Sequence, residues 1–316
     1  MTAKKSIILF VPTDYIGIIV TNALVPALVK SGLNPVLFDT GTAKNRQFKV
    51  QAPADLSFYN VGAFDKAVIP FLNTQTPAAG ATPAAMTYAQ LAQTHGLTHH
   101  VIKDVNDDAT RTLIDAVPDA IGAVSIRQLQ IFESAIIDRF KNIGFFWNIH
   151  SGLLPDYKGL LIPYRAIING EREYGWTLHD IDTHIDTGHI VDTCVSALDV
   201  NKPVLDTYLD MAGPAVEMIV RAVQNFPQVK KPNTGGTYYT YPTKEELSVF
   251  QRAGITYVAS PRAYVDRIIA SFSIPGTKHA DMLRDAVIQS MAGHFRSLPQ
   301  TQAEAAEALA ASRRRA

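Results

Sequence analysis

The stretch Ile7–Phe38, IILFVPTDYIGIIVTNALVPALVKSGLNPVLF, decides the fold that the sequence predicts. It begins with a continuous apolar run, Ile7–Val11, whose content of β-branched residues is typical of a strand buried on both faces of a parallel sheet. Apolar residues then recur with helical spacing over Ile16–Lys30, and Pro26 within this span predicts a kink or a break. A second short strand follows at Pro35–Phe38. The order strand, helix, strand predicts the first unit of an α/β sheet.

The same alternation repeats, more faintly, further along the chain. Helices are predicted over Met86–His95 and Phe132–Phe140, and strands over Ile121–Ser125 and Phe145–His150. We therefore expect an α/β fold with a Rossmann-like, open and mostly parallel sheet that has helices on both faces. Gly17 stands alone after the first strand, without the glycine pattern of a dinucleotide site, so this topology does not indicate NAD.

The composition excludes several classes of protein. With 316 residues, 47% of them hydrophobic and 18% charged, the chain is neither disordered nor fibrous. The 29 Lys and Arg residues balance 29 Asp and Glu residues, so no global charge attracts nucleic acid or an anionic membrane. Cys194 is the single cysteine, and the amino terminus lacks the apolar region of a signal peptide, which predicts a cytoplasmic location. No apolar run approaches the roughly 20 residues of a membrane span.

Two domains are predicted. Residues 1–205 carry the predicted sheet, and residues 206–316 form a smaller, largely helical C-terminal domain with a polar linker near 227–237. Within the first domain, Gly41–Pro83 shows the weakest secondary-structure pattern. We expect it to be an insertion with at most one strand. The Ala-rich tail from Thr301 is expected to be a solvated helix.

The C-terminal part contains clear helix signals. One helix is predicted over about Val204–Asn225 and another across Ala280–Met291. Thr243 and Glu246 have the spacing of a capping box, and Ser260 precedes a proline at the first position of a further helix. These patterns predict helices rather than strands in this region.

Residues 145–192 hold polar groups beside apolar runs. Asn148 and His150 lie two positions apart at the end of a predicted strand, so their side chains project to the same face. A loop rich in Gly and Pro follows this strand, at the edge where open α/β sheets bind ligands. A second polar loop, residues 182–188, contains Asp186. We expect these groups to share one site.

An amide, an imidazole and a carboxylate can together catalyse acyl transfer. The first two can bind a carbonyl oxygen as negative charge develops on it, and removing one such donor typically lowers the rate about 10²–10³-fold. The carboxylate can orient the imidazole and help to move the proton that an attacking amine loses. The chain has no G-x-S-x-G motif, and Cys194 lies within a predicted strand, so an enzyme nucleophile is not indicated.

At these residues the sequence resembles the 10-formyltetrahydrofolate-dependent formyltransferase family. The matching text is N-I-H-S-G-L-L-P-D-Y-K-G from Asn148 and G-W-T-L-H-D-I-D-T-H-I-D-T-G-H-I from Gly175. The resemblance covers about residues 116–197 and fades beyond residue 205. It implies the formyltransferase fold, a catalytic domain over residues 1–205, and three catalytic residues: Asn148, His150 and Asp186.

The resemblance also implies 10-formyltetrahydrofolate as co-substrate, with no metal. Residues of two stretches would line the pterin pocket, partly through backbone atoms: Arg127, Leu129, Asp182, Thr183, His184 and Ile185. A further group would contact the acceptor: Ser151, Gly152, Tyr157, Lys158 and His179. Gly152 and His179 look more like the branches of the family that act on small molecules and sugars than like the tRNA branch.

Two clusters have simpler alternative interpretations. Three histidines fall within one short segment, but no cysteine pair or H-E-x-x-H motif accompanies them, so a zinc site is not favoured: His179, His184 and His189. Three tyrosines could stack on a base or a sugar, although an edge strand explains them more simply: Tyr238, Tyr239 and Tyr241.

The predicted function is transfer of a formyl group to an amine of a small metabolite, either an aminosugar nucleotide or an amine derived from an amino acid. One alternative is a methionyl-tRNA formyltransferase, but that branch appends a strand-rich barrel, whereas residues 243–295 predict helices. Residues 201–316 also contain only 14 Lys and Arg against 10 Asp and Glu, a modest charge for binding tRNA. A second alternative is a non-catalytic folate- or nucleotide-binding protein. A homodimer formed through the helical C-terminal part is also considered.

Overall fold

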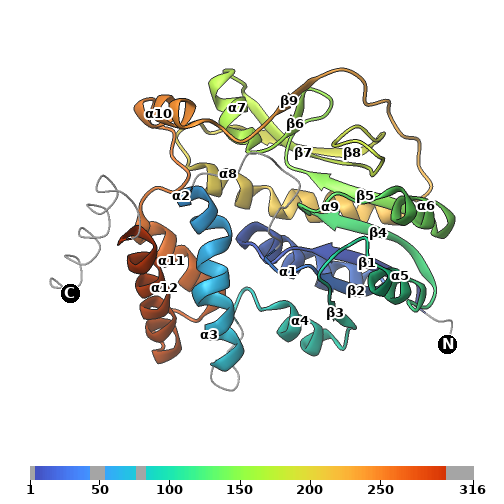
Figure 1. The fold of residues 1–316 in the computed structure, drawn as a ribbon, viewed down its shortest axis with the longest axis horizontal. Helices are drawn as coiled ribbons and strands as arrows, with labels where there is room; N and C mark the ends of the chain where they lie inside the picture. Colours follow the sequence, from blue (N-terminus) through green and yellow to red (C-terminus); the bar gives the residue numbers. More distant parts are fainter. Residues whose placement is uncertain (1–3, 43–53, 76–82, 297–316) are drawn as a thin grey trace.

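The computed structural model describes residues 4–42, 54–75 and 83–296. Its main sheet has seven strands in the order β3-β2-β1-β4-β5-β7-β8, and a second sheet pairs β6 with β9 (Figure 1). The strands are β1 (Ser6–Val11), β2 (Asn34–Asp39), β3 (His99–Val101), β4 (Ala120–Ile126), β5 (Phe145–His150), β6 (Tyr157–Gly159), β7 (Glu173–Asp180), β8 (Ile190–Ala197) and β9 (Thr237–Tyr239). The helices are α1 (Tyr15–Lys30), α2 (Ala54–Ser57), η1 (Phe58–Gly62), η2 (Phe64–Val68), α3 (Ile69–Thr74), α4 (Tyr88–His95), α5 (Asp108–Asp115), α6 (Ser134–Ile143), α7 (Ile162–Ile168), α8 (Val204–Asp210), α9 (Ala212–Gln224), α10 (Lys244–Arg252), α11 (Pro261–Phe272) and α12 (Lys278–Arg296).

The central strand β1 is buried on both faces, as its unbroken apolar run predicts. Alternate side chains enter two different apolar clusters, with Ile7 and Leu9 on one face and Ile8 and Phe10 on the other. Strands β3, β2, β1, β4 and β5 run parallel; at one edge β7 pairs antiparallel with β5, and β8 pairs antiparallel with β7. The prediction of an open, mostly parallel sheet is confirmed.

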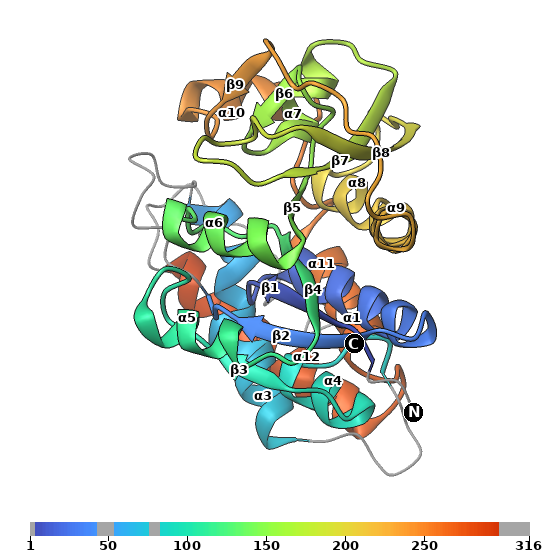
Figure 2. The same ribbon diagram turned by 90° about the vertical axis from the view of Figure 1, so that its right-hand side faces the viewer.

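Helices cover both faces of this sheet, as predicted (Figure 2). Helices α1 and α9 pack together on the face that receives Ile7 and Leu9, and α5 and α6 cover the opposite face. Asp14 caps the start of helix α1, because its carboxylate accepts a hydrogen bond from the Gly17 amide at 2.6 Å. The predicted kink position, Pro26, lies inside the continuous helix α1.

Most of the described part of Gly41–Pro83 is helical. Residues 54–74 form one run of successive helical turns, and none of the described residues of Gly41–Pro83 belongs to a strand, which agrees with the expectation of at most one. Residues 43–53 and 76–82 lie outside the described part of the chain. The described part of this segment therefore adds helices beside the sheet and no additional strand.

The C-terminal residues form the predicted helices but share the core of the first half. The predicted helix over Val204–Asn225 is two helices, α8 and α9. The capping box of Thr243 and the cap at Ser260 are both present. Helices α11 and α12 lie beside the 54–74 helices (Figure 1), and the buried ring of Phe272 packs 6.1 Å from that of Tyr15.

Because shared packing does not show which segment folds alone, the division at residue 205 stays a prediction. The tail from Thr301, expected to be a solvated helix, lies outside the described residues. Within residues 4–42, 54–75 and 83–296, no helix has the length and apolar character that crossing a membrane requires.

Candidate active site

The carboxyl ends of strands β1, β4 and β5 open into one cavity of about 680 Å³. Strands β1 and β4 are neighbours, yet the helices that follow them, α1 and α6, cover opposite faces of the sheet. Such a switch point leaves a crevice beyond the strand ends, which is where α/β sheets bind ligands. The residues lining this cavity include Asp14, Phe58, Asn60, Val61, Lys66, Arg127, Leu129, Asn148, Ile149, His150, Ser151, Leu161, Ile185, Asp186, Tyr208, Tyr238, Tyr241 and His294.

The structure brings the three predicted catalytic residues together. Asn148 and His150 both belong to β5, and Asp186 belongs to the loop that connects β7 to β8. The Nδ1 atom of His150 lies 3.4 Å from Oδ2 of Asp186. His179, on the antiparallel neighbour β7, joins the group because its Nε2 atom lies 3.1 Å from Nδ2 of Asn148 and 3.6 Å from Oδ1 of Asp186.

The protonation of His150 follows from its two ring partners. Its Nε2 atom donates a hydrogen bond of 2.6 Å to the carbonyl oxygen of Tyr157, so in the neutral ring Nδ1 carries the lone pair and faces Asp186. Burial lowers the pKa of His150, although Asp186 opposes this shift. Burial also disfavours the charged form of Asp186, but His150, His179 and the Gly159 amide lower its pKa to about 2. A neutral imidazole beside a carboxylate can accept a proton at Nδ1 and be stabilised once charged.

His179 fixes the orientation of Asn148. The Nδ1 atom of His179 donates to the carbonyl oxygen of Asp180 at 2.8 Å, which leaves Nε2 as an acceptor for one N–H of the Asn148 amide. Since that amide nitrogen carries two hydrogens, the second remains available to the cavity that Asn148 lines. The site therefore presents a fixed neutral donor next to a buried base.

Half of the predicted pterin-pocket residues line the cavity. Arg127, Leu129 and Ile185 do so, whereas Asp182, Thr183 and His184 are not among its lining residues. Asp182 instead closes its own turn, because its carboxylate accepts hydrogen bonds from the His184 amide and the Thr187 hydroxyl. The loop thus contributes one lining side chain before Asp186.

Arg127 has a strained backbone and a mostly buried side chain. Its φ of 53° is in the left-handed region, which non-glycine residues rarely adopt. Its guanidinium lies 5.0 Å from the centre of the Tyr208 ring, and its Nε atom lies 3.7 Å from Oδ2 of Asp14, beyond hydrogen-bonding distance. Within the described chain this Nε has no hydrogen-bond partner. Burial disfavours the charged form, but Asp14 and nearby tyrosines raise the pKa of Arg127.

The predicted acceptor-binding residues divide into two groups. Ser151 lines the cavity, and His179 acts from behind Asn148. The other three are not among the lining residues, and each makes a structural contact. Gly152 packs against the His150 ring. The Tyr157 hydroxyl donates a hydrogen bond to Glu171, and the buried Lys158 donates one to the carbonyl oxygen of Gly235.

Several lining residues were not predicted from the sequence. Asp14 and the side chains of the 54–74 helices, such as Phe58, form part of the wall. Tyr208 also lines the cavity, and it belongs to no motif that would distinguish it in the sequence. Of the three tyrosines near residue 240, Tyr238 and Tyr241 line the cavity. Tyr239 instead stacks on Tyr157, with ring centres 5.8 Å apart.

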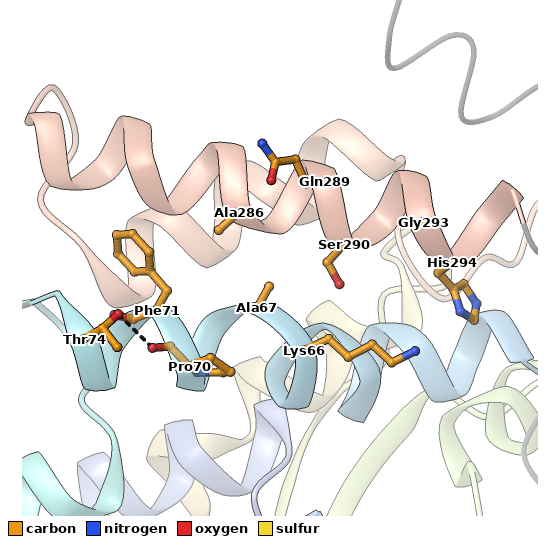
Figure 3. A pocket seen from close by; sticks show the side chains of 10 residues that line it. All are labelled: Lys66, Ala67, Pro70, Phe71, Thr74, Ala286, Gln289, Ser290, Gly293 and His294. Carbon is orange, nitrogen blue, oxygen red and sulfur yellow. Dashed lines mark hydrogen bonds between the residues drawn. The ribbon is translucent and has the colours of Figure 1, made fainter.

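A second hollow of about 740 Å³ lies between the 54–74 helices and α12 (Figure 3). Small side chains such as Ala67 and Ala286 face it, and Lys66 and His294 line both this hollow and the main cavity. In the part of the chain that the structure describes, no cluster of three or more His, Cys, Asp or Glu residues could hold a metal ion. His184 and His189 are exposed, whereas His179 is buried.

The fold and the site together define a class. The crystal structure of phosphoribosylglycinamide formyltransferase from Brucella melitensis superposes with a TM-score of 0.51 and 14% identity, covering 73% of this chain and all of that one. That likeness shows the fold. The family described as formyl transferase matches residues 118–202, the segment that contains Asn148, His150 and Asp186, so the predicted family resemblance is confirmed.

Curated relatives match parts of the chain. A methionyl-tRNA formyltransferase of Sphingopyxis alaskensis is 24% identical over 199 residues, which is 62% of this chain and 64% of the relative. A methionyl-tRNA formyltransferase of Finegoldia magna is 33% identical over 90 residues, 28% of each chain. The matches thus cover less than two thirds of these relatives.

Proposed function

We propose that this protein transfers a formyl group from 10-formyltetrahydrofolate to the amine of a small metabolite. The observation that carries the proposal is the convergence of Asn148, His150 and Asp186 on one cavity, inside the segment that matches the formyl transferase family. An aminosugar nucleotide and an amine derived from an amino acid are the two acceptor classes that we propose.

The cavity fits a folate in size and lining. Its volume of about 680 Å³ is within the range of small-molecule sites. Apolar side chains suited to a flat ring line part of it, namely Phe58, Val61, Ile149, Leu161 and Ile185. The Nε donor of Arg127 has no hydrogen-bond partner among the described residues, so a polar ligand atom would satisfy it. When bound, the folate would supply the formyl group.

The residues of the chain would perform three tasks. The free N–H of Asn148 would stabilise negative charge on the carbonyl oxygen, because a donor fixed by His179 needs no reorganisation. As the amine bonds to the formyl carbon, His150 would take its proton at Nδ1, directly or through water; the proton would pass to the tetrahydrofolate nitrogen when its bond to the formyl carbon breaks. Asp186, ionised because its pKa is about 2, would then stabilise the charged imidazole.

A methionyl-tRNA formyltransferase is the second candidate, favoured by the names of the curated relatives. In the described residues 204–296, β9 is the only strand, and helices α10 to α12 stand where a strand-rich barrel would be expected. We therefore place the small-molecule acceptor first. A non-catalytic folate-binding protein is the third candidate, and the three assembled catalytic groups argue against it.

The test is an acceptor panel. Purified protein and 10-formyltetrahydrofolate are incubated with aminosugar nucleotides, hydroxylated ornithine and lysine, glycinamide ribonucleotide and methionyl-tRNA, and release of tetrahydrofolate is followed. Turnover with a small amine supports the proposal. Turnover with methionyl-tRNA alone selects the second candidate, and folate binding without any turnover selects the third. The proposed homodimer is tested by the mass of the protein in solution.

A further inference from the structure

Residues 228–236, called here the strap, cross the loop that carries Asp186. The strap follows α9 and leads past β8 to β9 (Figure 1). Lys231 and Ile190 exchange two backbone hydrogen bonds of 2.8 Å, and Nζ of Lys230 donates to both carboxylate oxygens of Asp180 at 2.7 and 2.8 Å. The strap lies beyond the segment that matches the formyl transferase family. It is therefore held against the catalytic loop at several points.

Asn233 is the strap residue whose side chain donates hydrogen bonds to the loop that carries Asp186. Its side chain is buried, and its Nδ2 atom donates to the carbonyl oxygen of Asp186 at 3.0 Å and to that of Gly188 at 2.9 Å. Both hydrogens of one amide thus satisfy two carbonyl groups of the same turn. Its Oδ1 atom has no hydrogen-bond partner in the described chain, so Asn233 acts there as a donor.

The turn needs such support because Asp186 has a φ of 54°. The left-handed region costs a non-glycine residue about 1–2 kcal/mol, and a residue remains there only when its surroundings hold it. The side chain of Asp186 is held separately, because its Oδ2 atom accepts a hydrogen bond of 2.9 Å from the Gly159 amide. The backbone of Asp186 is held by Asn233.

We propose that Asn233 is a positioning residue, which fixes the left-handed backbone of Asp186 so that its carboxylate stays beside Nδ1 of His150. This inference rests on the role proposed above for Asp186. The rest of the loop has its own contacts, since Asp182 binds the Thr187 hydroxyl and the Asp180 amide binds the His189 carbonyl. Removing the Asn233 amide should therefore displace Asp186 without unfolding the loop.

The first test compares Asn233→Ala and Asn233→Asp with the control Thr234→Ala, whose side chain is exposed on the same strap. Displacing a catalytic group by about 1 Å can lower the rate roughly 10²-fold, so we expect kcat to fall about 10–100-fold in Asn233→Ala. KM for the folate should change little. Asn233→Asp should lose more, because a carboxylate donates no hydrogen bond and also places negative charge against the carbonyl oxygens of Asp186 and Gly188. A change confined to KM, or wild-type kcat, would overturn the proposal.

The second test does not depend on turnover. The ring of His150 is titrated by nitrogen-15 NMR in the wild type, in Asn233→Ala and in Asp186→Asn, which sets the full effect of the carboxylate. The ionisable groups that act on His150 are Asp186 and His179 from the β7 side and Arg127 from the end of β4.

We expect the pKa of His150 in Asn233→Ala to move toward its value in Asp186→Asn, while Thr234→Ala matches the wild type. An unchanged pKa in a folded Asn233→Ala protein refutes the positioning role even if no formyl acceptor is ever found. Should the alanine variant not fold, Asn233→Leu fills a similar volume without either N–H donor and undergoes the same titration. A wild-type pKa in that variant would likewise refute the role.

Discussion

Replacing Asp186 by Asn removes one charge while preserving the shape of the site. The asparagine can still accept the hydrogen bond from the Gly159 amide, which Oδ2 of Asp186 accepts at 2.9 Å. What disappears is the attraction between the carboxylate and a charged His150 at 3.4 Å. At an effective dielectric constant of about 20 this attraction is about 5 kcal/mol. In Asp186→Asn, the state in which His150 carries a proton loses most of this attraction. We therefore expect kcat to fall roughly 10³-fold.

The assay follows tetrahydrofolate release with the acceptor that the panel identifies. Asp192→Asn is the matched control, because Asp192 of β8 forms a partly exposed ion pair with Arg221 of α9, and such pairs contribute at most about 1 kcal/mol. That control should retain wild-type rates and folate binding. A rate within about threefold of the wild type in Asp186→Asn would show that His150 does not depend on this carboxylate.

Stability supplies a second check on the same variant. The pKa of Asp186 falls from its ordinary 3.8 to about 2, so the ionised group stabilises the folded state above pH 3.8. That stabilisation is about 2 kcal/mol, and it is lost as the pH falls from 3.8 to 2. Urea unfolding just above pH 3.8 should show a deficit of this size for Asp186→Asn, and the deficit should shrink near pH 2.

Three further predictions follow from the same geometry. Asn148→Ala removes the donor to the carbonyl oxygen, so kcat should fall about 10²–10³-fold with intact folding by circular dichroism. Gly152→Ala places a Cβ 2.5 Å from the Tyr157 carbonyl oxygen and 2.8 Å from Nε2 of His150, so it should impair activity, whereas Gly213→Ala meets open space and should not. Because burial lowers the pKa of His150, its neutral form persists at pH 7, and kcat/KM should fall with acid only below about pH 6.5; an acid limb centred above pH 7 contradicts this assignment.

The sequence predicted elements whose cause is local. The apolar run at Ile7–Val11 and the capping pattern of Thr243 depend on neighbouring residues, and the structure contains both. The 54–74 helices lack regular apolar spacing, and they are held by contacts with α11 and α12 that are distant in sequence, such as the hydrogen bond from the Tyr264 hydroxyl to the Tyr59 carbonyl.

The site shows the same division. The spacing of Asn148 and His150 placed them on one face of a strand, and the resemblance added Asp186. The antiparallel pairing that sets His179 opposite Asn148 depends on the register between β5 and β7, which the sequence does not reveal. Asn233 contacts the catalytic loop across a gap of 47 residues, and an isolated asparagine in a polar linker carries no pattern that would predict this.

The common core of the two halves limits how this protein can be dissected. A fragment ending at residue 202, where the family match stops, would contain Asn148, His150 and Asp186 but neither Asn233 nor the helices that support the cavity wall. Its three reactive groups would be present without the framework that aims them. The smallest useful fragment for biochemistry or engineering therefore extends through α12, and recombining such chains at the family boundary would separate the proposed catalytic groups from the residues that hold them.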